Sequence, residues 1–163
     1  MRLQILSRKI SNRAINEAGL EDCKIQYFKF MVRYFIHEKE MLEASKAYQT
    51  IYDTINKATP ELTKELDPTG GERKLAFQNF VLFLMLTPFT AEKVELMAKV
   101  DAMYPRELEA EDLLGKFMHK LQTFELMPLN EAEIESQLSQ FEPFQESVKN
   151  HKAHSREFVK QLI

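Results

Sequence analysis

Two histidines near the end of the sequence are the first residues whose type and spacing could bind a metal. His151 and His154 lie three residues apart on a predicted helix, with Glu146 and Glu157 close to them in sequence. A metal site needs three or four donors in fixed geometry, and no third ligand can be identified here. The pair is therefore interpreted as a solvated helix face, and we predict no metal and no cofactor.

Other enzyme motifs are incomplete. His37-Glu38 resembles the start of a zincin motif, but position 41 is Met, so the second histidine is missing. Cys23 follows two acidic residues that oppose thiolate formation, and it is interpreted as a structural cysteine. Gly70-Gly71 lacks the following Lys-Ser/Thr of a phosphate loop and is predicted to form a turn. No catalytic residue is predicted, and we expect the protein not to be an enzyme.

Two further groups of residues, one acidic and one aromatic, could form a ligand site but have simpler structural interpretations. The first group reads as a solvated acidic helix start, which suits the helix dipole: Glu107, Glu109, Glu111 and Asp112. A second group could form an aromatic platform, but at helical spacing it reads first as core: Tyr27, Tyr34, Tyr48 and Tyr52. The apolar run from Phe80 to Leu86 likewise reads as core before it reads as a lipid pocket.

Helical periodicity organises the segment that contains these tyrosines. The spacing predicts a first helix over residues 3–11 and a second from about Glu21 to Glu38, whose apolar face is broad enough to need more than one neighbour. A break at Lys39-Glu40 leads into a helix over residues 41–54. Small residues on that helix allow a close partner, so the pair is predicted to form an αα-hairpin.

Pro and Gly residues divide the remainder of the chain. Residues 56–72 form the longest connection, with a helical turn predicted over residues 61–66. A buried helix is predicted over residues 75–86 and ends at Pro88. Thr90 is predicted to cap a helix that runs to about Met103, where Tyr104-Pro105 stops it.

The last third is predicted to be helical as well. Apolar residues form a stripe over residues 114–124, and Asn130 with Glu133 resembles a capping box. The final segment after Pro143 is still amphipathic at Ile163, so we expect the chain to end inside an element. The whole is predicted as one helical-repeat segment over residues 1–163, divided into 1–55, 56–72, 73–127 and 128–163. Its predicted structural core comprises Phe28, Met31, Phe35, Ala44, Tyr48, Ile51, Tyr52, Phe80, Phe83 and Phe117.

Composition excludes several functions. The hydrophobic fraction of 44% and the charged fraction of 29% are those of a folded soluble protein. A net charge of −3 provides no basic surplus for nucleic acid. The apolar stretches are too short to span a membrane, and a single cysteine favours a reducing, intracellular compartment.

Four sequence blocks resemble a known family. They are ILSRKI at 5–10, KIQYFKFMVRYFIHE at 24–38, KAYQTIYDT at 46–54 and VLFLMLTPF at 81–89. In this order and spacing they are similar to the 26S proteasome non-ATPase regulatory subunit 12 family, whose members are lid components with a C-terminal PCI domain. The resemblance covers roughly residues 1–90, thins to LLGKF and FELM beyond, and includes no counterpart of the PCI winged helix.

The resemblance implies an all-α, right-handed α-solenoid of stacked helical hairpins with TPR-like repeats. It also implies a non-catalytic scaffold in the regulatory particle lid, in hetero-oligomeric contact with other lid subunits and with the ATPase ring and core particle. The implied location is the cytoplasm and nucleus. Nucleic acid and membranes are not expected as partners.

Three alternatives stay open. A related signalosome subunit shares the same architecture, although the IYDT motif and the closing Pro-Phe favour the proteasome. A free-standing helical-repeat adaptor would need polar inner faces, whereas these helices are rich in Phe, Met and Tyr. A metal-binding or lipid-binding helical domain would depend only on the His pair or on the run from Phe80 to Leu86.

Overall fold

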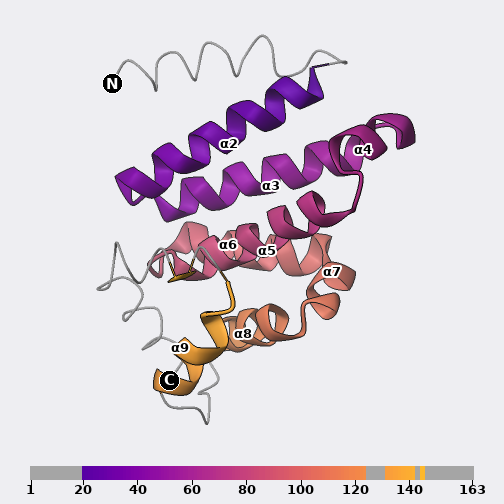
Figure 1. Ribbon diagram of the computed structural model, residues 1–163. Helices are drawn as coiled ribbons and strands as arrows, with labels where there is room; N and C mark the ends of the chain where they lie inside the picture. Colours follow the sequence, from indigo (N-terminus) through magenta and orange to yellow (C-terminus); the bar gives the residue numbers. More distant parts are fainter. Residues whose placement is uncertain (1–19, 124–130, 142–143, 146–163) are drawn as a thin grey trace. The chain divides into compact units, whose positions relative to one another are not determined.

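The computed structural model describes residues 20–123, 131–141 and 144–145, and every regular element in these ranges is an α-helix (Figure 1). The predicted all-α class is confirmed. The predicted helix over residues 3–11 and most of the segment after Pro143 lie outside the described residues. Contacts divide the chain into two compact units, with the boundary inside helix α5, between Phe77 and Gln78. The division into four segments predicted from the sequence stays a prediction.

The first unit is built on the predicted αα-hairpin. Helix α2 (Glu21–Glu38) packs along helix α3 (Met41–Lys57), and the two helices lie side by side in Figure 1. Lys39 adopts a left-handed conformation with φ of 64°. Its N–H donates to Ile36 O at 3.1 Å, and Glu40 N–H donates to Phe35 O at 2.8 Å. This pair of bonds is a Schellman motif, which satisfies the last carbonyls of α2 and reverses the chain.

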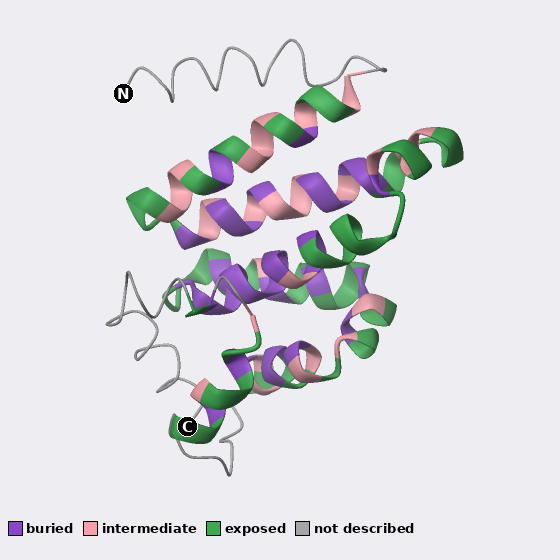
Figure 2. Ribbon diagram, in the orientation of Figure 1, coloured by how far each residue is buried: buried purple, intermediate pink, exposed green. Residues whose placement is uncertain are grey.

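The connection after α3 contains its own short helix. Helix α4 (Pro60–Leu66) confirms the helical turn predicted over residues 61–66. It begins with Pro at its first position, and the Thr59 hydroxyl accepts the N–H of Leu62 at 3.4 Å. No residue of α4 is buried, and Figure 2 shows it largely exposed, in contrast with the more deeply packed α3. Local capping therefore defines this helix more than packing does.

Asp67 caps the N-terminus of the next helix, α5 (Gly71–Leu86). Its carboxylate is buried, and it accepts the N–H of Glu72 at 3.1 Å and that of Arg73 at 2.9 Å. Gly70 has φ of 73°, a conformation that suits glycine. The predicted Gly70-Gly71 turn is thus confirmed, and an anion at the positive end of the helix stabilises it.

The second unit is built around the later part of α5. Every residue from Asn79 to Thr87 is buried. A helix that is apolar on all sides needs neighbours on all sides, and each fully buried large side chain contributes about 1.5–3 kcal/mol by leaving water. The predicted buried helix is confirmed, and it ends before Pro88.

Among the described residues, four further helices belong to the second unit. They are α6 (Ala91–Met103), α7 (Pro105–Ala110), α8 (Asp112–Thr123) and α9 (Glu131–Leu138). Thr90 caps α6 as predicted, because its hydroxyl accepts the N–H of Lys93 at 3.1 Å. Tyr104 ends α6, and its ring meets that of Phe80 edge to face, with centroids 6.1 Å apart. Helix α9 starts at the predicted place, although the capping residue Asn130 is outside the described residues.

Candidate interaction surface

The ten predicted core residues do not all have the same burial. Seven are buried: Met31, Ala44, Ile51 and Tyr52 in the first unit, and Phe80, Phe83 and Phe117 in the second. The other three, Phe28, Phe35 and Tyr48, are only half-buried. The expectation of full burial for these three is corrected by this observation.

The half-burial has a geometric reason. Phe28 and Phe35 line a shallow cavity of about 140 Å³ between α2 and α3, opposite Glu43 and Lys46. Lys46 donates to Glu43 at 2.7 Å, so the α3 side of this cavity is polar. Periodicity identifies a broad apolar face on a helix, but it does not say how much of that face a single neighbour covers.

The remaining tyrosines and Cys23 also differ from expectation. Tyr27 and Tyr34 are half-buried, whereas Tyr52 is buried and packs against Phe77 with ring centroids 5.2 Å apart. Cys23 is exposed, so it does not pack in the core as a structural cysteine usually does. The first turn of α2 leaves this position on the solvent side.

The structure tests only some of the predictions made for the histidines. His37 is exposed, with Nδ1 3.3 Å from Glu38 Oε1. Within residues 20–123, 131–141 and 144–145, no three His, Cys, Asp or Glu side chains form a group able to hold a metal ion. His151 and His154 lie outside these ranges.

The acidic segment predicted as one helix start belongs to two helices. Helix α7 ends at Ala110, and α8 begins at Asp112. Glu111 between them accepts a hydrogen bond from Gln78 Nε2 at 2.8 Å. Asp112 pairs with Lys116 at 2.7 Å, an exposed ion pair of the kind that contributes about 0–1 kcal/mol.

Gly115 allows α7 and α8 to meet. A Cβ atom at this position would lie 2.4 Å from the backbone oxygen of Leu108. Only the absence of a side chain permits this approach, so the glycine fixes the distance between the two helices. The signal is present in the sequence, because an isolated glycine within a helical stripe often marks close packing.

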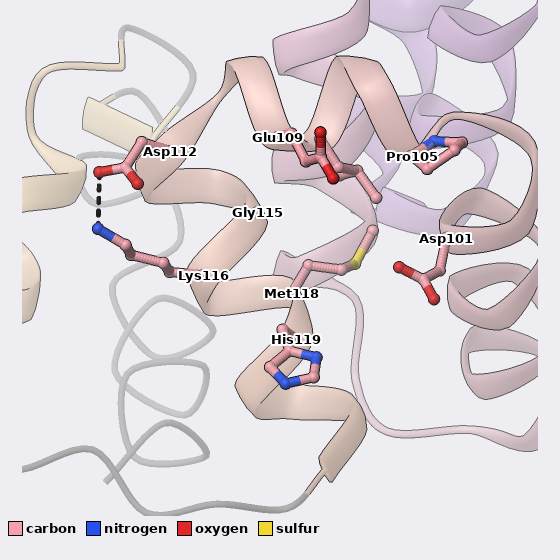
Figure 3. Close-up of a pocket in the computed structure, with 9 residues that line it drawn as sticks. Asp101, Pro105, Glu109, Asp112, Gly115, Lys116, Met118 and His119 are labelled. Atoms are coloured by element: carbon pink, nitrogen blue, oxygen red, sulfur yellow. Dashed lines mark hydrogen bonds and ion pairs between the residues drawn. The ribbon is translucent and has the colours of Figure 1, made fainter.

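Helices α6, α7 and α8 line a cavity of about 390 Å³ (Figure 3). Its apolar part comes from Pro105, Leu108 and Met118, and its charged part from α6, α7 and α8. Figure 3 shows the Asp112–Lys116 pair on one side and Asp101 on the other. The charged and titratable lining residues are Asp101, Glu109, Asp112, Lys116 and His119.

A second cavity, of about 260 Å³, lies between α6 and α8. Its wall is mainly apolar and is formed by Phe89, Val94, Met97, Ala98 and Leu121. Met97 is the buried part of this wall. Gln122 lines one edge, and its amide donates to Met97 O at 3.0 Å. Asp101 lines both cavities, so the two are adjacent along α6.

A lysine with no solvent exposure ties the start of α6 to the end of α5. Lys93 Nζ donates to Met85 O at 2.8 Å and to Thr87 O at 2.7 Å, and it lies 5.7 Å from the centre of the Phe89 ring. The carbonyls at a helix end lack partners within the helix, and they attract a cation. Burial lowers the pKa of Lys93 to about 8, because the charged ammonium is removed from water. No local sequence pattern indicates this role for Lys93.

The N-terminal part of the chain resembles a known protein family. The family described as "PSMD12/CSN4, N-terminal" matches residues 1–59, which include α2 and α3. The match covers the first 59 of the 163 residues, and over this region the chain is similar to that family.

Several proteins that the chain resembles are named as proteasome regulatory subunits. The chain is 28% identical over 143 residues to "26S proteasome non-ATPase regulatory subunit 12" of Dictyostelium discoideum, covering 84% of this chain and 30% of that protein. It is 26% identical over 113 residues to "26S proteasome regulatory subunit RPN5" of Saccharomyces cerevisiae, covering 69% and 23%. It is also 26% identical over 97 residues to "26S proteasome regulatory subunit rpn501" of Schizosaccharomyces pombe, covering 59% and 20%. The predicted relationship to the subunit 12 family is confirmed.

The relatives are much longer than this chain. The chain spans less than a third of the length of the relatives named above. No solved structure matches the chain. Among the described residues, no helix combines the length and apolar character that crossing a bilayer requires.

Proposed function

We propose that this chain is a non-catalytic scaffold subunit of the 26S proteasome regulatory particle, in its lid. The observation that carries the proposal is the match of residues 1–59 to the PSMD12/CSN4 N-terminal family, together with relatives that are named as proteasome regulatory subunits. The chain would act through contacts with other lid subunits, and with the ATPase ring and core particle, in the cytoplasm and nucleus.

The architecture supports a scaffold role. The α2–α3 hairpin is a two-helix unit of the kind that stacks in helical-repeat proteins, and half-buried aromatic residues remain on α2. We propose that such hairpins continue into a right-handed α-solenoid. Each hairpin would then bury its remaining apolar face against the next, and the array would offer extended surfaces to neighbouring subunits.

Affinity purification of the tagged chain from its source cells tests the proposal. We expect the chain to co-purify with proteasome subunits and to co-migrate with peptidase activity. Ala44→Pro serves as a disrupted variant, because Ala44 is completely buried in α3 and proline breaks a helix interior. Glu65→Ala on the exposed face of α4 serves as the matched control and is expected to assemble normally. Recovery of the chain without any proteasome subunit would refute the proposal and favour a free-standing adaptor.

A signalosome subunit is the second candidate function. The matched family joins subunit 12 with CSN4 in one description, so that match does not separate the two complexes. The named relatives are proteasome subunits, which favours the proteasome. Co-purification with cullin-linked partners, in place of peptidase activity, would decide for the signalosome.

A further inference from the structure

The two adjacent cavities along α6 form one groove with two chemical parts. We define the α6–α8 groove by Val94, Ala98, Asp101, Glu109 and Leu121. Val94, Ala98 and Asp101 occupy positions i, i+4 and i+7 of α6, so they lie on one face of the helix. The groove is therefore apolar at its Val94 end and acidic at its Asp101 end.

The apolar part is open and of limited size. Phe89 and Val94 are 45% and 43% exposed, although both are large apolar residues. A cavity of about 260 Å³ is below the roughly 300–1,000 Å³ of pockets for small molecules and cofactors. Its size and its aliphatic and aromatic walls suit one inserted side chain of a protein partner better than a free ligand.

The acidic part determines the charge of the partner. Three carboxylates and one ammonium line the larger cavity, and that ammonium, on Lys116, is already paired with Asp112. The carboxylates of Asp101 and Glu109 are exposed and make no hydrogen bond or ion pair with other described residues. A cationic side chain that enters here gains two carboxylate partners, whereas an anionic one is repelled.

The spacing along α6 sets the spacing on the partner. Ala98 and Asp101 are three residues apart, which corresponds to about 4.5 Å along the helix axis. An aliphatic residue and a Lys or Arg three or four residues apart on a partner helix have a similar separation, roughly 5–6 Å between their Cβ atoms. An amphipathic helix can therefore satisfy both parts of the groove at once.

We propose that the α6–α8 groove docks a helical segment of a neighbouring subunit. This segment inserts an aliphatic side chain beside Val94 and Ala98, and it places a Lys or Arg one turn away against Asp101 and Glu109. The proposal rests on the proposed scaffold function, and it assigns one of the contacts to a defined surface with a defined partner chemistry.

A photo-crosslinker at position 98 tests the contact in the assembled particle. Replacement of Ala98 by p-benzoylphenylalanine is expected to give a crosslink to another subunit, at a peptide with an aliphatic residue and a Lys or Arg three or four positions apart. The same crosslinker at Glu65 on α4 is the control for nonspecific labelling. The proposal is overturned by a crosslink to this chain's own residues, by one to a segment without that pair, or by no crosslink in a chain that still co-purifies with proteasome subunits.

A peptide assay tests the groove separately from the proteasome. The probe is a fluorescent helical 15-residue peptide with Leu and Arg four positions apart, and its partner probe carries Glu in place of Arg. Fluorescence anisotropy with the purified full chain is expected to show about tenfold weaker binding of the Glu probe, because like charges oppose docking. Asp101→Lys is expected to reverse this preference, whereas Glu65→Lys on α4 is not.

Equal binding of the two probes, or a preference that Asp101→Lys leaves unchanged, overturns the proposal. If the chain shows the charge preference but fails to co-purify with proteasome subunits, the proposed function fails while the groove chemistry stands. If it co-purifies but shows no preference, the scaffold function stands and the groove assignment fails.

Discussion

Helices α2 and α5 are both rich in large apolar residues, yet they are buried to very different degrees. All residues of α5 from Asn79 onward are buried, whereas α2 buries only Ile25, Met31 and Val32 and leaves Phe30 66% exposed. In the first unit α2 packs mainly along α3, while in the second unit the end of α5 is covered on all sides. Apolar content thus predicts that a helix will be packed, and the number of neighbours decides how completely.

The largest expected effect is a difference in unfolding free energy between two side-chain truncations, one in each compact unit. Phe83→Ala removes a side chain that is 1% exposed and is expected to destabilise the protein by about 3–5 kcal/mol. Tyr48→Ala removes a half-buried ring from α3, so the loss is expected to be about half as large. Urea denaturation of both variants measures the difference. Equal losses would mean that α3 is packed as tightly around Tyr48 as the centre of the second unit is around Phe83.

The next effect concerns the buried charge at the end of α5. The pKa of Lys93 is about 8 in the folded chain and 10.5 in the unfolded chain, so the unfolded state binds this proton more tightly. Stability is therefore expected to rise between pH 8 and 10.5, by on the order of 2–3 kcal/mol, as folded Lys93 loses its charge before the unfolded chain does. Lys93→Met is expected to abolish this increment, measured as the difference between wild-type and variant unfolding free energies across that range.

The matched control for Lys93 is Lys99→Met. Lys99 is exposed and pairs with Glu95 at 2.7 Å on the same helix. Its removal is expected to leave the alkaline increment intact, because that increment is assigned to the buried amine of Lys93. An unchanged pH profile in Lys93→Met would show that the two carbonyls stabilise the ammonium enough to offset its burial.

Gly115→Ala tests how closely the helices of the second unit meet. The added Cβ would lie 2.4 Å from Leu108 O, so α7 and α8 have to separate, at an expected cost of about 1–3 kcal/mol. The matched control is Gly71→Ala at the start of α5, where the nearest atom is the Thr69 hydroxyl oxygen at 3.2 Å, a contact that a small side-chain movement can relieve. Thermal unfolding that ranks the control as the more damaging variant would contradict this account.

The smallest effect is a stabilisation at the α2–α3 turn. Lys39 is the only residue other than glycine with positive φ among the described residues, and the left-handed conformation costs an L-residue about 1–2 kcal/mol. Lys39→Gly relieves this strain but increases the freedom of the unfolded chain, so a net gain of about 0.5–1 kcal/mol is expected. Chemical denaturation measures it, with Glu38→Gly, inside the last turn of α2, expected to destabilise instead.

The sequence predicts the elements of this fold well where a local signal defines them. Pro88 ends the preceding helix because its ring and missing N–H disfavour a helical conformation, and Thr90 begins the next helix because its hydroxyl accepts a backbone N–H. Both helix limits are found in the structure. The fully apolar run in α5 also indicates its burial without further information. These features depend on residues within one or two turns of each other.

The candidate interaction surface could not be predicted in this way. No sequence pattern identifies Lys93, because its carbonyl partners, Met85 O and Thr87 O, lie on the other side of the α5–α6 turn and their approach depends on how the two helices pack. Asp101 and Glu109 read as ordinary surface charges, and only the packing of α6, α7 and α8 brings them to one cavity. The half-burial of Phe28 and Phe35 likewise depends on what α3 places opposite them.

The enclosure of Lys93 makes its amine a chemical reporter of local opening. Acylating reagents need an accessible, neutral amine, and in the folded chain this one is shielded and donates to two carbonyls. Its labelling rate therefore follows how often the corner between α5 and α6 comes apart, and Lys99 in the same helix supplies the unprotected rate. A mass-spectrometric ratio of the two labels would report the transient exposure of this corner, even inside an assembled particle.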